Sequence, residues 1–357
     1  MWNDKRLTEL LEIEHPIIQA PMAGSSTPQM AAASANAGCL GSLGCAMMSA
    51  ETYTSTYNET RSMTNGALNM NFFCHEAPEI DAGKITKIEE ILKPYYDELG
   101  IEIMPESVAT HFPFSGVVAD AVLLSAPNVV SFHFGLPEQA LVNALKEKGV
   151  KILSSATTVA EAKNLEARGV DAIIAQGWEA GGHHGFYLKE KTAGIGTIAL
   201  VPQLVDAVNV PIIAAGGIAD GRGIAAALAL GAAGVQIGTA FLTCEESSVP
   251  QVHQDSLMAS DGSNTALTKV FSGRPARGIQ NRYMDDLSAI EEELLDFPLM
   301  NTLTGPLRKQ SASNQSADFV AQWSGQAVGL NRKTNVSDLI ESLVEETKTV
   351  MQNLYKE

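Results

Sequence analysis

The densest group of potentially reactive side chains lies in one glycine-rich segment, QGWEAGGHHG, at residues 176–185. The glycines Gly181 and Gly182 let the backbone approach a ligand closely. His183 and His184 supply imidazoles, which exchange protons near neutral pH. Because neighbouring side chains diverge in extended backbone, we expect His183, which follows the glycines directly, to face the ligand. The same divergence argues against a metal site. The segment predicts a catalytic imidazole without a metal, with a structural loop histidine as the alternative.

Two later glycine-rich turns carry residue types that bind phosphate, AAGGIADGRG at 214–223 and QIGT at 236–239. Glycine exposes backbone N–H groups to phosphate oxygens, the N-terminus of a following helix adds a favourable dipole, and a threonine adds a hydroxyl. The alternative is that the glycines only permit tight turns. A phosphate site is favoured because both turns carry the signal. The residues concerned are Gly216, Gly217, Gln236, Gly238 and Thr239.

Three further positions end apolar runs and carry useful groups. His133 lies between two phenylalanines and is interpreted either as a pocket residue or as a core histidine. Asn71 offers a neutral donor and acceptor to the edge of a heterocycle or to a phosphate oxygen. The backbone at Pro21 and Met22 is placed to lie against a flat ring.

The elements that position these residues are eight apolar runs, each followed by a small-residue turn and an amphipathic stretch. Continuous rather than alternating apolar runs are typical of parallel strands buried on both faces. Eight such units predict an α/β protein with a (β/α)8 TIM barrel, whose active sites lie at the C-terminal ends of the strands. A doubly wound sheet is the alternative, but it normally uses fewer strands. The runs are 16–20, 39–44, 67–73, 129–134, 150–156, 171–177, 211–217 and 234–241.

Two segments do not fit the repeated strand–turn–helix pattern. A long excursion at 75–128 follows the third strand, and a C-terminal extension follows the eighth. We divide the chain into a barrel at 1–243 and an extension at 244–357 that packs on the barrel and helps cover the active site. Apolar residues at helical spacing predict a final helix at about 337–355 that lies against the barrel.

Charge and composition exclude several classes of protein. The 357 residues carry 41 acidic and 24 basic side chains, a net charge of −17, which disfavours binding to nucleic acid or to a membrane surface. Residues 224–244 are uncharged and long enough to cross a bilayer, but their glycines predict a buried helix, a turn and a strand. The four cysteines form no CxxC pair and no zinc pattern, and the N-terminus does not resemble a signal peptide. We therefore expect a cytoplasmic protein.

The glycine-rich turns and the polar residues at the strand ends together predict a phosphorylated, planar cofactor in the mouth of the barrel. FMN fits best, because it ends in a phosphate and requires no GxGxxG, which the chain lacks. Five segments of the chain resemble motifs of the nitronate monooxygenase family, formerly called 2-nitropropane dioxygenase. They are QAPMAG at 19–24, QGWEAGGHHG at 176–185, AAGGIADGRG at 214–223, GVQIGTAFL at 234–242 and SGRPARG at 272–278. NFFCH at 71–75 and SFHFGLP at 131–137 resemble its class I branch.

This resemblance implies an FMN-dependent barrel that oxidises alkyl nitronates, propionate 3-nitronate among them, with O₂ to a carbonyl compound and nitrite. It implies that His183 is the catalytic residue. After Gly278 the chain departs from the pattern, because Phe297 stands where a tyrosine is expected and Tyr283 lies elsewhere. The FMN contacts that it implies are Asn71, Gln176, Gly181, Gly182, Gly217, Gln236, Gly238 and Thr239.

Three alternatives stay open. An FMN-dependent enoyl-thioester (enoyl-ACP) reductase of the same barrel type would consume NAD(P)H. A nucleotide-dehydrogenase barrel is weaker, because the loop after the sixth strand has no cysteine. A flavin-binding protein without turnover would not need His183 at the ring. The sequence leaves open the physiological nitronate, the oligomeric state and whether neutral nitroalkanes are also turned over.

Overall fold

Eight parallel strands form a nearly closed barrel in the computed structural model, which describes residues 2–105, 113–188 and 194–354. The strands pair in the order β1-β9-β8-β6-β5-β4-β3-β2, and a bridge between Ile18 and Leu40 links the two ends. Each strand falls within an apolar run of the sequence, so the predicted (β/α)8 barrel is confirmed. The strands are β1 (Ile17–Gln19), β2 (Gly41–Gly44), β3 (Leu68–Phe73), β4 (Val129–His133), β5 (Lys151–Ala156), β6 (Ala172–Gln176), β8 (Ile212–Ala215) and β9 (Gly234–Ile237).

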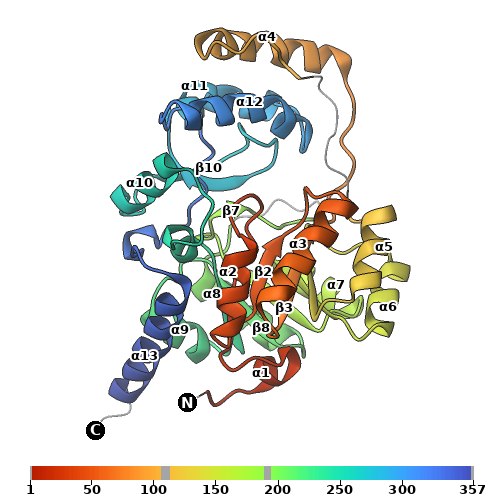
Figure 1. Cartoon of the computed structure of the whole chain (residues 1–357), viewed down its shortest axis with the longest axis vertical. Helices are drawn as coiled ribbons and strands as arrows, with labels where there is room; N and C mark the ends of the chain where they lie inside the picture. Colours follow the sequence, from red (N-terminus) through yellow and green to blue (C-terminus); the bar gives the residue numbers. More distant parts are fainter. Residues whose placement is uncertain (1, 106–112, 189–193, 355–357) are drawn as a thin grey trace.

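Helices surround the strands because both faces of a parallel sheet must be covered (Figure 1). α1 (Arg6–Leu11) packs Leu7 and Leu11 against a cluster that includes residues of several strands. The predicted C-terminal helix is α13 (Val336–Leu354), which packs on α9 and α2. The other barrel helices are α2 (Pro28–Asn36), α3 (Ala50–Met63), α5 (Gly116–Ser125), α6 (Gln139–Glu147), α7 (Val159–Ala167), α8 (Thr197–Ala207) and α9 (Gly221–Ala229).

The uncharged stretch at 224–244 divides as predicted into the body of α9, a turn and β9, followed by the 3₁₀ helix η1 (Thr239–Thr243). Within the described ranges, no helix has both the length and the hydropathy needed to cross a membrane.

A second apolar core lies beyond the barrel and combines two distant parts of the sequence. α4 (Ala82–Glu98), from the excursion after β3, contributes Ile88 and Leu92. The segment after β9 contributes Phe271 and Leu303, and Figure 1 shows α4 above α11 and α12. The predicted division at residue 243 stays a prediction. The elements between β9 and α13, after η1, are α10 (Gln251–Ala259), β10 (Thr265–Thr268), β11 (Ala276–Ile279), α11 (Arg282–Leu287), η2 (Ser288–Glu293), α12 (Leu299–Ser313) and η3 (Val328–Leu330).

A small antiparallel sheet connects the two regions, and the apolar pattern did not predict it. Its strand order is β10-β11-β7, where β7 is only Gly182–His183, in the loop after β6. His183 pairs with Ala276 and Gly182 with Arg277. The C-terminal extension therefore holds the histidine loop by backbone pairing.

Gly221 offers a test of the contact between α9 and α13. A Cβ at Gly221 would lie 2.3 Å from the backbone nitrogen of Thr347, whereas a Cβ at Gly223 would approach only Ile218, at 3.3 Å. We expect Gly221→Ala to lower the free energy of unfolding by about 1–3 kcal/mol through overpacking. Gly223→Ala is the matched control and should stay within about 1 kcal/mol, because alanine favours helix. Thermal unfolding of both variants measures the difference, and equal midpoints would contradict the close packing.

Candidate active site

The predicted site residues gather on one rim, at the C-terminal ends of the barrel strands. Loops from β1, β3, β4, β6, β8 and β9 all contribute to it. In chain order the residues are Pro21 and Met22 after β1, Asn71 on β3, His133 on β4, Gln176 on β6, Gly181 to His183 in the next loop, Gly216 and Gly217 after β8, Gln236 on β9, and Gly238 and Thr239 after it.

The backbone of His183 is fixed from the barrel side as well as by β11. Its carbonyl oxygen accepts hydrogen bonds from Nε2 of His133 at 3.0 Å and from Nε2 of Gln176 at 2.9 Å. Oε1 of Gln176 accepts from the backbone N–H of Gly185 at 2.7 Å. Gln176 therefore uses both ends of its amide to hold the loop, a role that the sequence did not predict.

His133 is held in a single tautomer by its partners. Because the carbonyl of His183 can only accept, Nε2 of His133 carries the hydrogen, and Nδ1 accepts from the hydroxyl of Ser155 at 2.5 Å. Burial lowers the pKa of His133 to about 3, so the ring is neutral. These contacts make His133 a support of the His183 loop, and its predicted place in the substrate pocket stays a prediction.

The imidazole of His183 lies among aromatic rings and beside one hydroxyl. Its Nε2 is 2.9 Å from Oγ of Ser272. Phe297, whose position the sequence had marked as a departure from the family pattern, lies 5.7 Å away between ring centroids. The other rings, between 5.6 and 6.2 Å away, are Phe73, Phe134 and Trp323. Ser272 and Trp323 were missed as site residues, although the SGRPARG motif had pointed to the neighbourhood of Ser272.

Positive charge collects near His183 in a chain of strongly negative net charge. Burial, helped by the positive charges of Arg274 and Arg308, lowers the pKa of His183 to about 3, so the imidazole is neutral at physiological pH. Within the described residues, neither arginine has a carboxylate at ion-pair distance. The guanidinium of Arg274 lies 3.8 Å above the ring of Phe134. Glu161 and Glu76 act on Arg274 from beyond ion-pair distance, but the charges that act on His183 itself are positive and favour an anion beside it.

His184 occupies the opposite side of the loop. Its side chain is buried with its ring 4.9 Å from that of Trp178, and its backbone N–H donates to Pro275 at 3.0 Å. The two neighbouring imidazoles thus diverge, and His183 alone joins the aromatic group at the rim.

The turns after β8 and β9 present hydrogen-bond donors. Gly216 and Gly217 have φ of 105° and 71°, which only glycine adopts without strain. The backbone N–H groups of Gly217 and Gly238 donate to no other residue that the structure describes. The hydroxyl of Thr239 accepts from the N–H of Gly325 at 2.9 Å, so its own hydrogen remains available to an anion. These donors fit a phosphate.

Two side-chain amides lie on barrel strands, Gln236 on β9 and Asn71 on β3. The buried Oε1 of Gln236 has no hydrogen-bond partner among the described residues. Asn71 donates its amide hydrogens to Ser131, at 3.0 Å from the hydroxyl oxygen and 3.2 Å from the carbonyl oxygen, and is largely buried. An unpaired buried carbonyl is costly unless a ligand donates to it. The position of Gln236 therefore fits the N–H edge of a heterocycle.

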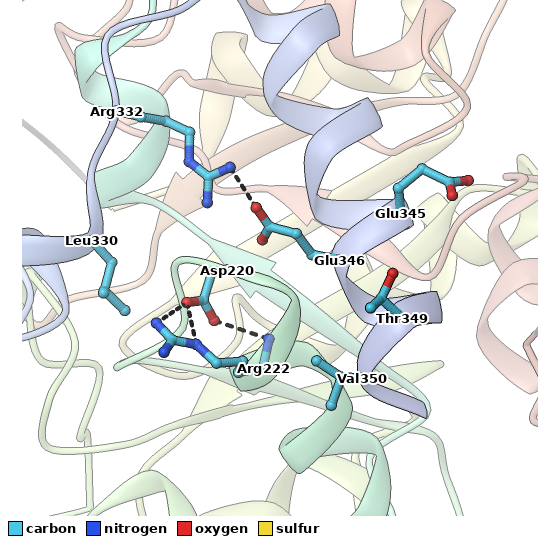
Figure 2. Close-up of a pocket in the computed structure, with 8 residues that line it drawn as sticks. All are labelled: Asp220, Arg222, Leu330, Arg332, Glu345, Glu346, Thr349 and Val350. Carbon is cyan, nitrogen blue, oxygen red and sulfur yellow. Dashed lines mark hydrogen bonds and ion pairs between the residues drawn. The ribbon is translucent and has the colours of Figure 1, made fainter. Parts of the chain in front are cut away.

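The sequence predicted that the N-terminus of α9 helps to bind a phosphate, but side chains of the protein itself occupy its N–H groups. Asp220 accepts from the N–H groups of Arg222 and Gly223 at 2.9 and 3.2 Å, and Glu346 of α13 accepts from the N–H of Gly221 at 3.0 Å. Two carboxylates of the chain thus satisfy this helix terminus, and Figure 2 shows Asp220 beside Arg222. Anion binding must rely on the preceding turn and on the turn after β9.

A surface hollow of about 520 Å³ lies beside these carboxylates, between α9 and α13 (Figure 2). Arg222 pairs with Asp220 at 2.5 Å, and Arg332 pairs with Glu346 at 2.6 Å. Most charged side chains that line the hollow therefore pair with one another. None of the predicted site residues lines the hollow. It is lined by Asp220, Arg222, Leu330, Arg332, Glu345, Glu346, Thr349 and Val350.

The C-terminal segment also holds the turn after β9. Nδ2 of Asn331 donates to the carbonyl of Thr239 at 3.0 Å, and the hydroxyl of Thr243 donates to the carbonyl of Arg332 at 2.9 Å. A Cβ at Gly181 would lie 2.5 Å from the nitrogen of Gly325, so the same segment also packs on the loop after β6. Nothing in the spacing of the sequence indicated these contacts. Across the described ranges, no group of three or more His, Cys, Asp or Glu side chains could hold a metal ion.

Buried neutral histidines should make stability depend on pH. Burial lowers the pKa of His253 to about 4, below its ordinary value of 6.5, and its Nε2–H donates to the carbonyl of Trp323. Between pH 6.5 and 4, His253 is therefore protonated in the unfolded chain but neutral in the native state. Stability falls through that window as the pH falls, by up to about 1.4 kcal/mol per pH unit for each such histidine. His133, His183 and His184 act in the same direction.

We expect His253→Gln to weaken this dependence, because glutamine can donate to Trp323 but does not titrate. Urea unfolding at pH 7 and pH 5 measures the change. The variant should lose about 1–2 kcal/mol less than the parent between these two values. An unchanged pH dependence would show that His253 is protonated in the native state.

Comparison with known proteins assigns the chain to a family along nearly its whole length. A family model described as nitronate monooxygenase matches residues 4–346. A protein of Staphylococcus aureus named "Probable nitronate monooxygenase" is 38% identical over 354 residues, which are 99% of each chain.

Two solved structures extend the likeness. A nitroalkane oxidase from Streptomyces ansochromogenes has a TM-score of 0.89 at 35% identity and covers 98% of this chain and 99% of its own. FabK from Thermotoga maritima has a TM-score of 0.77 at 29% identity, covering 98% and 97%.

Proposed function

The chain belongs to the nitronate monooxygenase family of flavin oxidoreductases, and we propose that it uses noncovalent FMN to oxidise alkyl nitronates with O₂ to a carbonyl compound and nitrite. The observation that carries the proposal is the neutral imidazole of His183. It is held on the rim by two side-chain hydrogen bonds to its carbonyl and faces aromatic rings. Propionate 3-nitronate is one expected substrate, and a cytoplasmic location stays a prediction.

The residues present fit FMN. The N–H groups of Gly217 and Gly238 and the hydroxyl of Thr239 would hold the phosphate, and Gln236 and Asn71 would meet the edge of the ring system. The other proposed cofactor neighbours are Pro21, Met22, Gln176, Gly181, Gly182 and Gly216. When bound, the flavin supplies the electron transfer that no protein side chain provides.

The protein contributes position and field. A nitronate is an anion, and Arg274 and Arg308 supply positive charge near His183 that no carboxylate of the described residues neutralises at ion-pair distance. The rings of Phe73, Phe134 and Phe297 form an apolar surround beside that charge. A less polar surround strengthens the attraction between substrate and guanidinium groups.

The structural similarity to FabK supports a second candidate function, an enoyl-thioester reductase that uses NAD(P)H. It does not favour this candidate over the first. The two candidates differ in the reductant. A nitronate carries its own electrons, whereas the reductase takes them from a nicotinamide.

The test compares reductants under anaerobic conditions. The purified protein should be yellow and should release FMN, not FAD, on acid precipitation. In stopped-flow mixing we expect an alkyl nitronate to change the flavin spectrum rapidly, while NADH and NADPH leave it unchanged. In air, the nitronate should give stoichiometric nitrite. Rapid bleaching by NADPH with no response to nitronate would transfer the protein to the reductase candidate.

His183 and His184 provide a matched pair of substitutions. His183→Asn should lower turnover strongly, by about 10²-fold or more on any substrate that must lose a proton, because it removes the imidazole at the rim. A smaller effect is expected on a preformed nitronate. His184→Asn changes a ring packed on Trp178 and should leave the rate within about threefold. Steady-state nitrite release measures both, and equal losses would contradict the assigned orientation.

A further inference from the structure

Ser272 is the one polar side chain in hydrogen-bond contact with the imidazole of His183 among the described residues. It follows Phe271 of the second core and precedes β11, and it is almost fully buried. Its Oγ has three neighbours at hydrogen-bond distance. They are Nε2 of His183 at 2.9 Å, the carbonyl oxygen of Arg274 at 3.1 Å and the backbone nitrogen of Arg274 at 3.3 Å.

The chemistry of these neighbours restricts where the protons lie. A serine hydroxyl donates one hydrogen and accepts up to two. The carbonyl of Arg274 can only accept, and the backbone N–H of Arg274 can only donate. One arrangement satisfies all three contacts: Ser272 donates to the carbonyl of Arg274 and accepts from its N–H and from Nε2–H of His183. If Ser272 instead donated to His183, the carbonyl of Arg274 would lose its hydrogen bond, which is unfavourable at a buried position.

From this we infer that Ser272 is a positioning residue that holds the hydrogen of neutral His183 on Nε2 and leaves Nδ1 as a bare base. The inference rests on the proposed function and concerns only which ring nitrogen acts when the substrate is a neutral nitroalkane, which must lose a proton before it can be oxidised. Nδ1 takes the proton from the carbon next to the nitro group. The electron pair of that C–H bond becomes the second C–N bond, and one N–O π pair moves onto oxygen. The products are a nitronate and an imidazolium, and no oxidant is consumed.

The surroundings of His183 suit this step. The low pKa of the His183 imidazole, about 3, keeps the ring neutral near pH 7, so its single hydrogen lies on one of the two ring nitrogens. His133 and Gln176 fix the carbonyl of the same residue, which restricts movement of the ring relative to Ser272. The nitronate that forms is attracted by the imidazolium beside it and by Arg274 and Arg308, which offsets the cost of charging a partly buried ring.

Substitution of Ser272 separates this role from a merely structural one. Ser272→Ala removes the group that selects the tautomer, while Ser272→Thr keeps the hydroxyl. For a nitroalkane, we expect Ser272→Ala to lower kcat/KM about tenfold or more, since a general base typically contributes about 10²–10⁴-fold. For the corresponding preformed nitronate, the loss should be several-fold smaller, because no proton has to leave carbon. Ser272→Thr should retain both activities. Equal losses on the two substrates would overturn the inference.

A spectroscopic measurement tests the tautomer without any substrate. In flavin-loaded protein labelled with ¹⁵N-histidine, long-range ¹H–¹⁵N correlation distinguishes protonated from bare ring nitrogens, and His183→Asn identifies the signals of His183. We expect Nε2 protonated and Nδ1 bare in the parent, and a mixture of tautomers in Ser272→Ala. A parent protein with its hydrogen on Nδ1 would refute the inference even if nitronates are turned over. Inactivity of the parent on all nitronates would refute the proposed function while the NMR result still stood.

Discussion

The site depends on how one short piece of backbone, Gly182–His183, is held between two structures. From the barrel, His133 and Gln176 donate to the carbonyl of His183. From the C-terminal extension, β11 pairs with the same two residues. A loop that is fixed on both sides loses its conformational freedom during folding, not during binding, so little ordering entropy remains to oppose the ligand. The positive φ of Gly182 shows why a side chain there would strain this arrangement.

Much of the architecture could be predicted because it depends on local patterns. Continuous apolar runs located each barrel strand, and the rule that barrel sites lie at strand C-termini placed Gln236 and His183 on one rim. The contacts of Ser272 and Gly325 could not be found this way. Ser272 meets His183 across 89 residues, and Gly325 meets Thr239 across 86 residues. Such pairs follow from the packing of the extension on the barrel, which no periodicity encodes.

Residue type indicates what a side chain can donate or accept, but not which groups it contacts in the fold. Gln176 was expected at the cofactor, which stays a prediction, and its amide also satisfies the loop backbone. The N-terminus of α9 was expected to bind an anion, and Asp220 and Glu346 already fill that role. In both cases a buried polar group found a partner within the chain, since leaving it unpaired is costly. A donor or acceptor becomes a candidate for ligand binding only when the fold leaves it unpaired, as at Gln236.

The second core has a consequence for how the chain is made. α4 leaves the ribosome early, yet Leu92 packs with Leu303 and Phe319, which follow about 200 residues later. At the usual rate of synthesis this delay lasts about 10–40 s. During that interval the apolar face of α4 has no native cover, although the barrel strands that follow it are already emerging. The nascent protein therefore requires that this helix stay exposed or be shielded by a chaperone until the extension arrives.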